Sequence, residues 1–347
     1  MLIRWDAHWH GGRRWYQGWP EWPASGRSYA HNVLVALCGG VGAARMLSGL
    51  VRVVPADDIT AIVNVGDDME LHGLSISPDL DTVTYTLAGM DNRETGWGVA
   101  GESWAVMDEL GRLGGDDWFR LGDRDLATHL FRTGRLRAGA PLSAVTAELG
   151  RRRGIAVRLV PVTDDTLRTR VVLAEASALG PPGTEVSFQD YFVRLHHGVP
   201  VRGVRFEGAD SSRPAPGVMD ALGGADTIVV CPSNPVVSIG PVLAVPGVRE
   251  ALVARRDRVV AVSPIVAGAA LKGPADRLMA ELGTEPSVVG VARLYAPWVG
   301  TLVVDVADAS HASAIEAEGL RCVVTPTVMH TPERAETLAR AVVDAVD

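Results

Sequence analysis

Four aspartates stand within a span of fifteen residues, two in the segment NVGDD and two in SPDLD. They are Asp67, Asp68, Asp79 and Asp81. Closely spaced carboxylates repel one another unless a cation or a hydroxylated ligand shares their charge. Adjacent acids at the end of a strand suit a hard divalent cation, which takes oxygen ligands. We therefore select Asp67 and Asp68 as candidate metal ligands. The alternative is a solvated acidic loop, with the second pair offsetting the dipole of a helix.

A glycine-rich turn, CGGVGAARM, precedes these acids. Gly39, Gly40 and Gly42 open a helical pattern, and the backbone N–H groups at such a helix start bind anions. Arg45 stands where the dinucleotide fingerprint has its third glycine, and it would add a charge-assisted contact. The Gly-Lys-Ser/Thr of a P-loop is absent, and the only lysine, Lys272, is remote in the chain. The turn therefore predicts phosphate binding outside both motifs; the alternative is a plain strand–helix corner.

Two later segments also carry polar side chains. The turn CPSNPVVSIGP, with Ser233 and Asn234, follows a predicted strand at the point where an open α/β sheet binds its ligands. In the segment GDRDLATH we expect Asp123 to cap a helix. On that helix, Asp125 and His129 are four residues apart, which favours an ordinary surface pair over a catalytic role.

The elements that must position these residues alternate between strand and helix. Near-continuous apolar runs predict buried parallel strands at 33–37, 58–65, 226–231, 258–262, 301–306 and 321–325. Helical patterns fall at 43–51, 78–88, 247–254 and 332–346. This order predicts an α/β fold, a Rossmann-like doubly wound and mostly parallel sheet with a smaller inserted α+β lobe.

The domain limits follow from where this alternation stops and resumes. We assign residues 31–105 and 221–347 to the Rossmann-like domain and 106–220 to the inserted lobe. Residues 1–30 hold several tryptophans without any period, and we expect a disordered or spurious N-terminal extension there.

Composition excludes some classes of function. The formal charge of −8, with dispersed arginines, is opposite in sign to the charge of a surface that binds nucleic acid. No apolar run is long enough for a membrane span. Cys38, Cys231 and Cys322 stand singly in apolar runs, which predicts reduced thiols and a cytoplasmic protein.

Six segments together resemble a known family. They are CGGVGAARMLSGL, NVGDD, SPDLDTVTYTLAG, FRLGDRDLATHL, PSNPVVSIGPVLAVPGVREAL and AVSPIVAGAALKGPADRLM, in that order. They resemble the 2-phospho-L-lactate transferase family of coenzyme F420 biosynthesis, most nearly its actinobacterial phosphoenolpyruvate transferase branch. The likeness extends from about residue 33 to the C-terminus and does not cover residues 1–30.

The resemblance implies an enzyme that transfers substituted phosphate groups. It would move a phosphoenolpyruvyl or 2-phospholactyl group from a GDP-linked donor to the deazaflavin Fo, with Mg²⁺, and release GMP. By motif, Asp81 and Arg120 match deazaflavin-binding positions, and we select Asp123 beside them as a further deazaflavin-binding candidate. As a hypothesis, Asp67 and Asp68 hold Mg²⁺, and Asp67 and Asp81 are catalytic, Asp81 by orienting or deprotonating the ribityl hydroxyl. The family resemblance also suggests a homodimer.

Two other functions compete with this one. A non-catalytic nucleotide-sugar-binding regulator shares the glycine turn and the Asn-Pro turn, but the segments GDRDLATH and DNRETGWG fit the transferases better. An NAD(P)-dependent oxidoreductase is disfavoured by Arg45 and by the Asp67–Asp68 pair.

Overall fold

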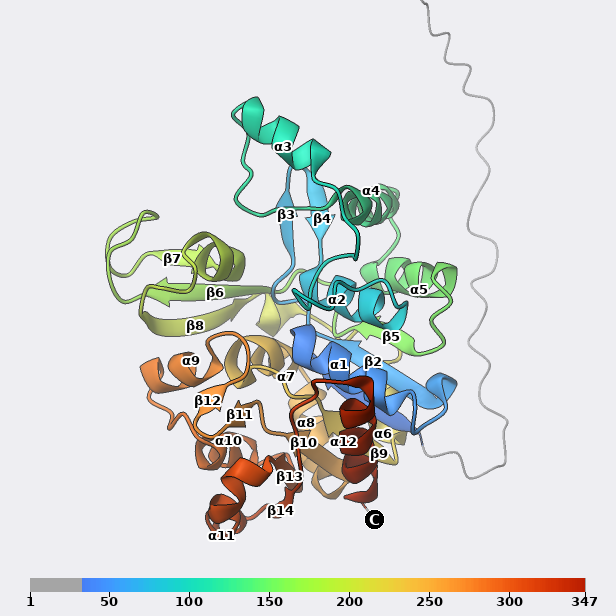
Figure 1. Cartoon of the computed structure of the whole chain (residues 1–347), viewed down its shortest axis with the longest axis vertical. Coiled ribbons are helices and arrows are strands. Elements are labelled where there is room, and N and C mark those ends of the chain that lie inside the picture. The colour runs from blue at the N-terminus through green and yellow to red at the C-terminus, as the bar shows by residue number, and fades with distance from the viewer. Residues whose placement is uncertain (1–32, 347) are drawn as a thin grey trace, which may run out of the picture. The chain divides into compact units, whose positions relative to one another are not determined.

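The computed structural model describes residues 33–346. The expected N-terminal extension, residues 1–30, therefore lies outside the described residues. Figure 1 shows the described chain as a central sheet with helices on both sides and smaller elements beyond the ends of its strands.

The central sheet has seven strands in the order β14-β13-β10-β9-β1-β2-β5, and each neighbouring pair is parallel. The strands are β1 (Leu34–Cys38), β2 (Ile59–Val63), β5 (Arg158–Pro161), β9 (Thr227–Val230), β10 (Val259–Val262), β13 (Thr301–Val304) and β14 (Arg321–Val324). The chain order reverses between β1 and β9, which lie side by side. The predicted α/β doubly wound fold is confirmed.

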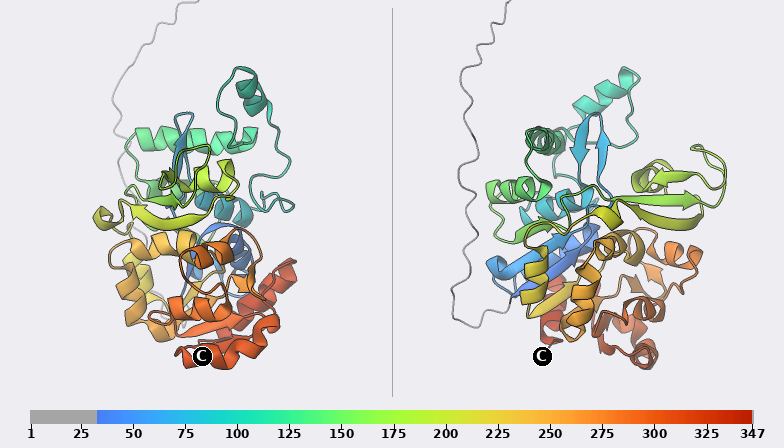
Figure 2. Two further views of the ribbon diagram at one scale, coloured as in Figure 1. Left: turned by 90° about the vertical axis from the view of Figure 1, so that its left-hand side faces the viewer. Right: turned by 180° about the vertical axis from the view of Figure 1, so that it is seen from behind.

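Helices cover both faces of the sheet because its inner strands are apolar on both sides. On one face α1 (Gly40–Leu50) packs against α2 (Pro78–Leu87) and α12 (Pro332–Asp344) (Figure 1). On the other face α6 (Val218–Gly224) packs against α8 (Val248–Ala254) (Figure 2). The remaining helices and strands towards the C-terminal end are α7 (Gly240–Ala244), β11 (Ile265–Val266), β12 (Ala269–Ala270), α9 (Ala275–Glu281), α10 (Val288–Tyr295) and α11 (Ala312–Ala317).

A hairpin and three helices extend from the carboxyl end of β2 (Figure 1). The hairpin, β3 (Met69–Leu71) and β4 (Leu74–Ile76), was not predicted and directly follows the acidic pair. It shares a small apolar cluster with α3 (Ala105–Arg112) and α4 (Asp123–Arg137), through Ile76, Met107 and Leu126. The third helix, α5 (Leu142–Arg152), leads back to the central sheet at β5.

A separate three-stranded antiparallel sheet has the strand order β7-β6-β8. Its strands are β6 (Arg168–Leu173), β7 (Glu185–Ser187) and β8 (Val201–Glu207). Buried and half-buried residues alternate along β6, as expected when one face of a sheet packs on a core. That core is separate from the main one and includes Val171, Val186 and Tyr191.

The range 106–220 is therefore more than an inserted lobe. It supplies helices, the small antiparallel sheet and, between them, β5, which pairs with β2 at the edge of the central sheet. The predicted limits treated the whole range as an insertion and missed this strand.

Among the described residues, no single helix has the length and apolar character that crossing a membrane requires. By those two criteria alone, only the bent pair Pro235–Ala244 and Val248–Ala254 qualifies, with 94° between its halves.

Candidate functional site

The acidic loop after β2 and the first turn of α2 converge at the carboxyl edge of the sheet. Asp67, Asp79 and Asp81 are only 6%, 7% and 5% exposed. Asn64, at the end of β2, donates through its side-chain amide to Asp79 Oδ2 at 2.9 Å. The loop and the helix are thereby tied together, so the predicted aspartates meet in one place.

Three of these carboxyls lie in a poorly neutralised environment; we call Asp67, Asp68 and Asp79 the acidic cluster. Burial raises the pKa of Asp67 well above its usual value, and the charges of Asp79 and Asp68 raise it further. Burial raises the pKa of Asp68 to about 7, against the opposing hydrogen bond from Ser77. Burial likewise raises the pKa of Asp79 to about 6, against hydrogen bonds from Asn64 and the Gly40 N–H.

The acidic cluster fits a divalent cation. Asp67 Oδ1 and Asp68 Oδ1 are buried and have no hydrogen-bond partner among the described residues. A buried carboxylate oxygen without a partner is costly, and a hard cation that takes oxygen ligands removes that cost. The predicted metal ligands thus have the free oxygen atoms that the prediction requires.

Ser77 has a different role from a helix cap. It stands at the N-cap position of α2, with Pro78 next to it, but its side chain makes no capping hydrogen bond. Its hydroxyl donates instead to Asp68 Oδ2 at 2.7 Å. Ser77 therefore fixes one oxygen of Asp68 and leaves the other oxygen free.

One backbone amide of the predicted phosphate-binding turn already donates a hydrogen bond within the protein. The Gly40 N–H, at the start of α1, donates to the carboxylate of Asp79. A Cβ on Gly42 would stand 2.1 Å from the carbonyl oxygen of Pro232, so only glycine allows the turn to approach this segment. The glycine turn therefore lies directly against the segment that contains Ser233 and Asn234.

Ser233 and Asn234 differ in what they can still bind. Ser233 is buried, and its hydroxyl has no hydrogen-bond partner among the described residues. Asn234 Oδ1 accepts from the backbone N–H groups of Val236 and Val237 at 2.9 and 3.3 Å. Ser233 is thus free for a ligand, whereas the Asn234 oxygen supports its own turn.

Asp81 belongs to a buried network between α2 and α4. Arg132 donates to both carboxylate oxygens of Asp81. His129, 1% exposed, has Nε2 3.2 Å from Asp125 Oδ2 and Nδ1 3.7 Å from Asp81 Oδ2. Tyr85 donates its hydroxyl to Asp125. The prediction that Asp125 and His129 form a surface pair is wrong, because this side of α4 faces α2 rather than solvent.

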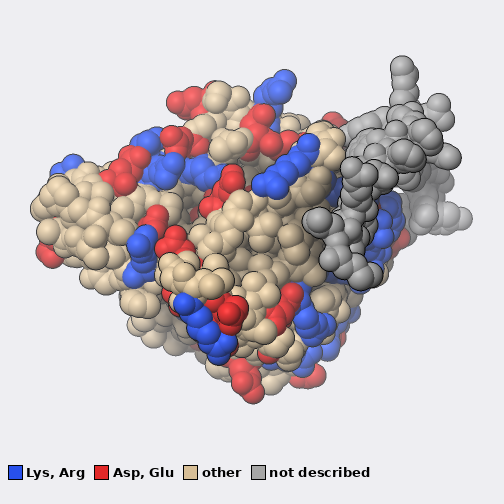
Figure 3. All heavy atoms as spheres, turned by 90° about the horizontal axis from the view of Figure 1, so that it is seen from above, with Lys and Arg blue, Asp and Glu red and all other residues tan. Residues whose placement is uncertain are grey.

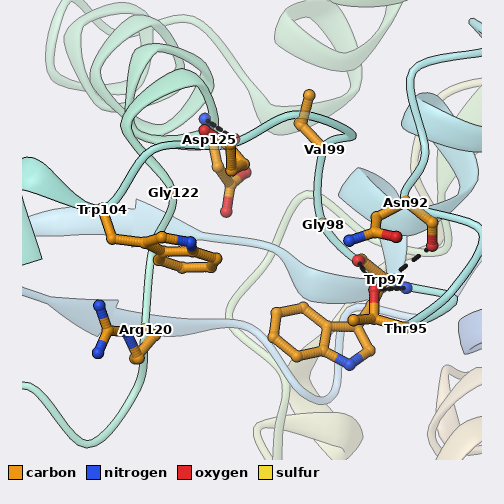
Figure 4. A pocket seen from close by; sticks show the side chains of 10 residues that line it. Asn92, Thr95, Trp97, Gly98, Val99, Trp104, Arg120, Gly122 and Asp125 are labelled. Carbon is orange, nitrogen blue, oxygen red and sulfur yellow. Dashed lines mark hydrogen bonds between the residues drawn. The ribbon is translucent and has the colours of Figure 1, made fainter.

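A pocket opens beside this network (Figure 4). Its lining includes Trp97, Trp104, Arg120 and Asp125. The Arg120 guanidinium lies 5.1 Å from the centre of the Trp104 ring and donates to Asp108 at 2.6 Å. Asp125 belongs both to the pocket wall, which Arg120 also lines, and to the buried network that contains Asp81, so this one carboxylate connects the pocket to the network.

Asp123 is not among the residues that line this pocket. Its carboxylate accepts from the Ser103 hydroxyl and from the backbone N–H groups of Ala105 and Val106, at 2.7 to 3.1 Å. These bonds, that from Ser103 foremost, lower its pKa. Asp123 does cap a helix, as predicted, but the helix is α3; Glu102 accepts from the first amides of α4.

A family model described as "2-phospho-L-lactate transferase CofD" matches residues 34–343. The chain belongs to this family.

Curated relatives of this transferase agree with the family match. A "Phosphoenolpyruvate transferase" of Kitasatospora aureofaciens is 47% identical over 311 residues, which cover 88% of this chain and 95% of the relative. Another, of Streptomyces coelicolor, is 46% identical over 310 residues, with 88% and 96% coverage. A third, of Mycolicibacterium smegmatis, is 40% identical over 324 residues, with 90% and 98% coverage.

A solved structure supports the fold of the transferase. A member of the UPF0052 family from Bacillus halodurans superposes with a TM-score of 0.56 at 17% identity. The match covers 91% of this chain and 99% of that one. At this identity the likeness concerns the fold alone.

Two basic residues near the candidate site were not predicted from the sequence. Arg132 follows Asp125 and His129 at a spacing of i, i+4, i+7, and this polar stripe on one helical face was the available signal. Lys272 was judged remote from the glycine turn, yet its ammonium reaches the Thr95 carbonyl at 2.9 Å and lies near Arg45. Distance along the chain was a poor guide for a residue on a loop.

Proposed function

We propose that this transferase moves a phosphoenolpyruvyl or 2-phospholactyl group from a GDP-linked donor to the deazaflavin Fo and releases GMP. Its family and its relatives support the transfer of such groups in coenzyme F420 biosynthesis. One observation carries the finer proposal: the free, buried oxygens of Asp67 and Asp68 stand at the same edge of the sheet as the glycine turn.

In the proposed reaction, the primary hydroxyl of the ribityl chain attacks the phosphorus that bears the enolpyruvyl or lactyl ester. A new P–O bond forms to the hydroxyl oxygen, the P–O bond to GMP breaks, and the hydroxyl proton passes to a carboxylate. A carboxylate with a pKa of about 6, as in Asp79, suits proton acceptance near neutral pH. Most of the acceleration in such a reaction comes from positioning and charge neutralisation.

The network around Asp81 favours orientation over proton transfer for that residue. Arg132 donates to both of its oxygens, so the carboxylate is held in one place. Of the two roles predicted for Asp81, we therefore propose that it orients the acceptor hydroxyl. Arg120 and Asp125, in the pocket wall, would contact the remainder of the deazaflavin.

We propose Asp67 and Asp68 as the residues that hold Mg²⁺, because their free oxygens lie beside the turn expected to bind phosphate. When bound, Mg²⁺ would neutralise charge on the diphosphate. Ser77 would keep Asp68 in position for it.

The test is incubation with Fo, Mg²⁺ and, separately, GDP that bears a lactyl, enolpyruvyl or glyceryl ester on its β-phosphate. We expect GMP and one product mass with the natural donor. Asp67→Asn should lower the rate on the order of a hundredfold or more, whereas Asp257→Asn, an exposed control, should not. An unchanged rate in Asp67→Asn would show that the assignment of this residue is wrong.

The proposal also covers the location of the enzyme, its oligomeric state and the class of molecule on which it acts. The face in Figure 3 carries interspersed acidic and basic side chains, unlike the continuous basic surface of a nucleic-acid-binding protein. We propose a cytoplasmic homodimer that acts on small molecules; light scattering after gel filtration tests its mass.

A further inference from the structure

Two cationic side chains lie together beside the first turn of α1. A Cβ placed on Gly96 would stand 2.7 Å from Lys272 Nζ and 3.7 Å from a terminal nitrogen of Arg45. The same point is 3.1 Å from Cγ1 of Val41, the second residue of α1. Lys272 and Arg45 are therefore neighbours, although they come from distant parts of the chain.

Among the described residues, these two cations have no counter-charge. Within residues 33–346, no carboxylate forms a salt bridge with Arg45 or Lys272. In the part of the chain that the structure describes, the Lys272 ammonium donates one hydrogen bond, to the neutral carbonyl of Thr95. Burial and the charge of Arg45 both lower the pKa of Lys272. Two like charges held together without a partner are unfavourable, and an anion placed between them removes the cost.

We propose that Arg45 and Lys272 form an anion site for the phosphate groups of a nucleoside diphosphate. The site lies beside Val41, while the preceding residue, Gly40, faces Asp79 of the acidic cluster. A diphosphate bound at the start of α1 would thus meet cations on one side and the cluster on the other. The nucleotide class rests on the proposed function; the anion site rests on the two cations alone.

Lys272 has a second role that Arg45 lacks. Its bond to the Thr95 carbonyl ties the segment before α9 to the loop that bears Trp97, a residue of the pocket wall. Substitution of Lys272 therefore disturbs both anion binding and this loop, whereas substitution of Arg45 disturbs only anion binding. The two variants together separate recognition of the anion from support of the loop.

The test is calorimetric titration of the full chain with inorganic pyrophosphate, GDP and guanosine, in EDTA so that no metal contributes. Arg45→Gln and Lys272→Gln should each weaken binding of pyrophosphate and GDP on the order of tenfold to a hundredfold. Guanosine binding should not change. Arg52→Gln, just beyond α1 and paired with Glu336, is the matched control. Thermal unfolding confirms that each variant is folded.

The outcomes separate this inference from the proposed donor. If the wild type binds pyrophosphate but not GDP, and both variants lose pyrophosphate, the anion site stands and the GDP-linked donor is wrong. If the wild type binds neither probe, or if both variants bind pyrophosphate within twofold of the wild type, the anion site is wrong. Loss of pyrophosphate binding in Lys272→Gln but not in Arg45→Gln also overturns the anion site, because that result assigns the effect to the loop.

Discussion

At the residue scale, aspartates that lie a few residues apart in the chain have two different electrostatic environments. Asp81 has an internal cation, Arg132, which binds both of its oxygens. Among the described residues, the carboxyls of the acidic cluster have no such partner, and burial raises their pKa values. The Asp81 carboxylate is thus neutralised by a residue of the protein itself, whereas the carboxylates of the acidic cluster would be neutralised by a bound cation.

This difference predicts an unusual effect of pH on stability without metal. Unfolded aspartates titrate near pH 4, while Asp79 and Asp68 titrate at about 6 and 7 in the fold. Between these values the folded chain binds more protons, so its free energy of unfolding falls as pH rises from 4 to about 7. Urea unfolding in EDTA at pH 5 and 8 measures the fall.

Two controls identify the source of that fall. Asp68→Asn has no carboxyl to ionise and should show a smaller loss of stability between pH 5 and 8. Adding Mg²⁺ at pH 8 should raise the stability of the wild type, because a ligand that binds only the folded state stabilises it. An equal pH dependence in Asp68→Asn would contradict the raised pKa of this residue.

The buried pair of Asp81 and Arg132 makes a second prediction. Both side chains are almost fully buried, so Arg132→Met leaves a carboxylate without its partner and should cost about 3–5 kcal/mol. Adding Asp81→Leu should recover most of this loss, because no buried charge remains. Arg112→Met, in an exposed pair with Glu109, is the control and should be neutral. Urea unfolding of the four proteins checks this, and an Arg132→Met variant as stable as the wild type would refute it.

At the scale of elements, α3 and α4 cap one another. Asp123, the first residue of α4, accepts from the first amides of α3, and Glu102, before α3, accepts from the first amides of α4. The first turn of each helix is therefore capped by a side chain that lies at or just before the start of the other helix. The pocket residues Trp104 and Arg120 lie between these two capping residues in the chain, so the caps hold the pocket wall.

We therefore expect Asp123→Ala to loosen α3 rather than unfold the protein. Hydrogen exchange at the amides of Ala105 and Val106 should become several-fold faster, because both lose their acceptor. Asp116→Ala, on the loop after α3, should leave the exchange unchanged. If Asp123 instead bound the acceptor directly, Asp123→Ala would raise the KM for Fo without any change in exchange.

The contact between the glycine turn and the Pro232 carbonyl predicts opposite effects for two glycines. Gly42→Ala places a methyl 2.1 Å from a backbone oxygen and should cost about 1–3 kcal/mol or more. Gly134→Ala, in the interior of α4, meets no atom within 4 Å and should stabilise by about 0.5–1 kcal/mol. Urea midpoints for the two variants should therefore move in opposite directions. Equal midpoints would show that the turn and the Pro232 segment are not packed as described.

At the scale of the whole molecule, the sequence predicted the central sheet well. The strands β1, β2, β9 and β10 fall within one or two residues of their expected limits, because doubly buried parallel strands are short uninterrupted apolar runs. The helices α2 and α12 were equally clear, since each starts with proline at its first turn.

Other elements carried weaker signals. The hairpin β3–β4 was missed because its short strands are half exposed and include Glu70. The edge strand β5 was missed because its run of four residues lies inside a segment of mixed character. For the site, the spacing of Asp125 and His129 is the same in a surface pair and in a buried network. Only the packing of α4 against α2 decides between them.

The place of β1 at the centre of the sheet has a consequence for how the chain is made. One neighbour, β2, follows it closely, but the other, β9, is far along the chain: the bond from Val33 to Asp226 spans 193 residues. At about 5–20 residues per second, synthesis of that stretch takes roughly 10–40 s. During this time one apolar edge of β1 has no strand to pair with. We therefore expect the yield of active enzyme to depend on protection of that edge during synthesis as well as on the final stability of the fold.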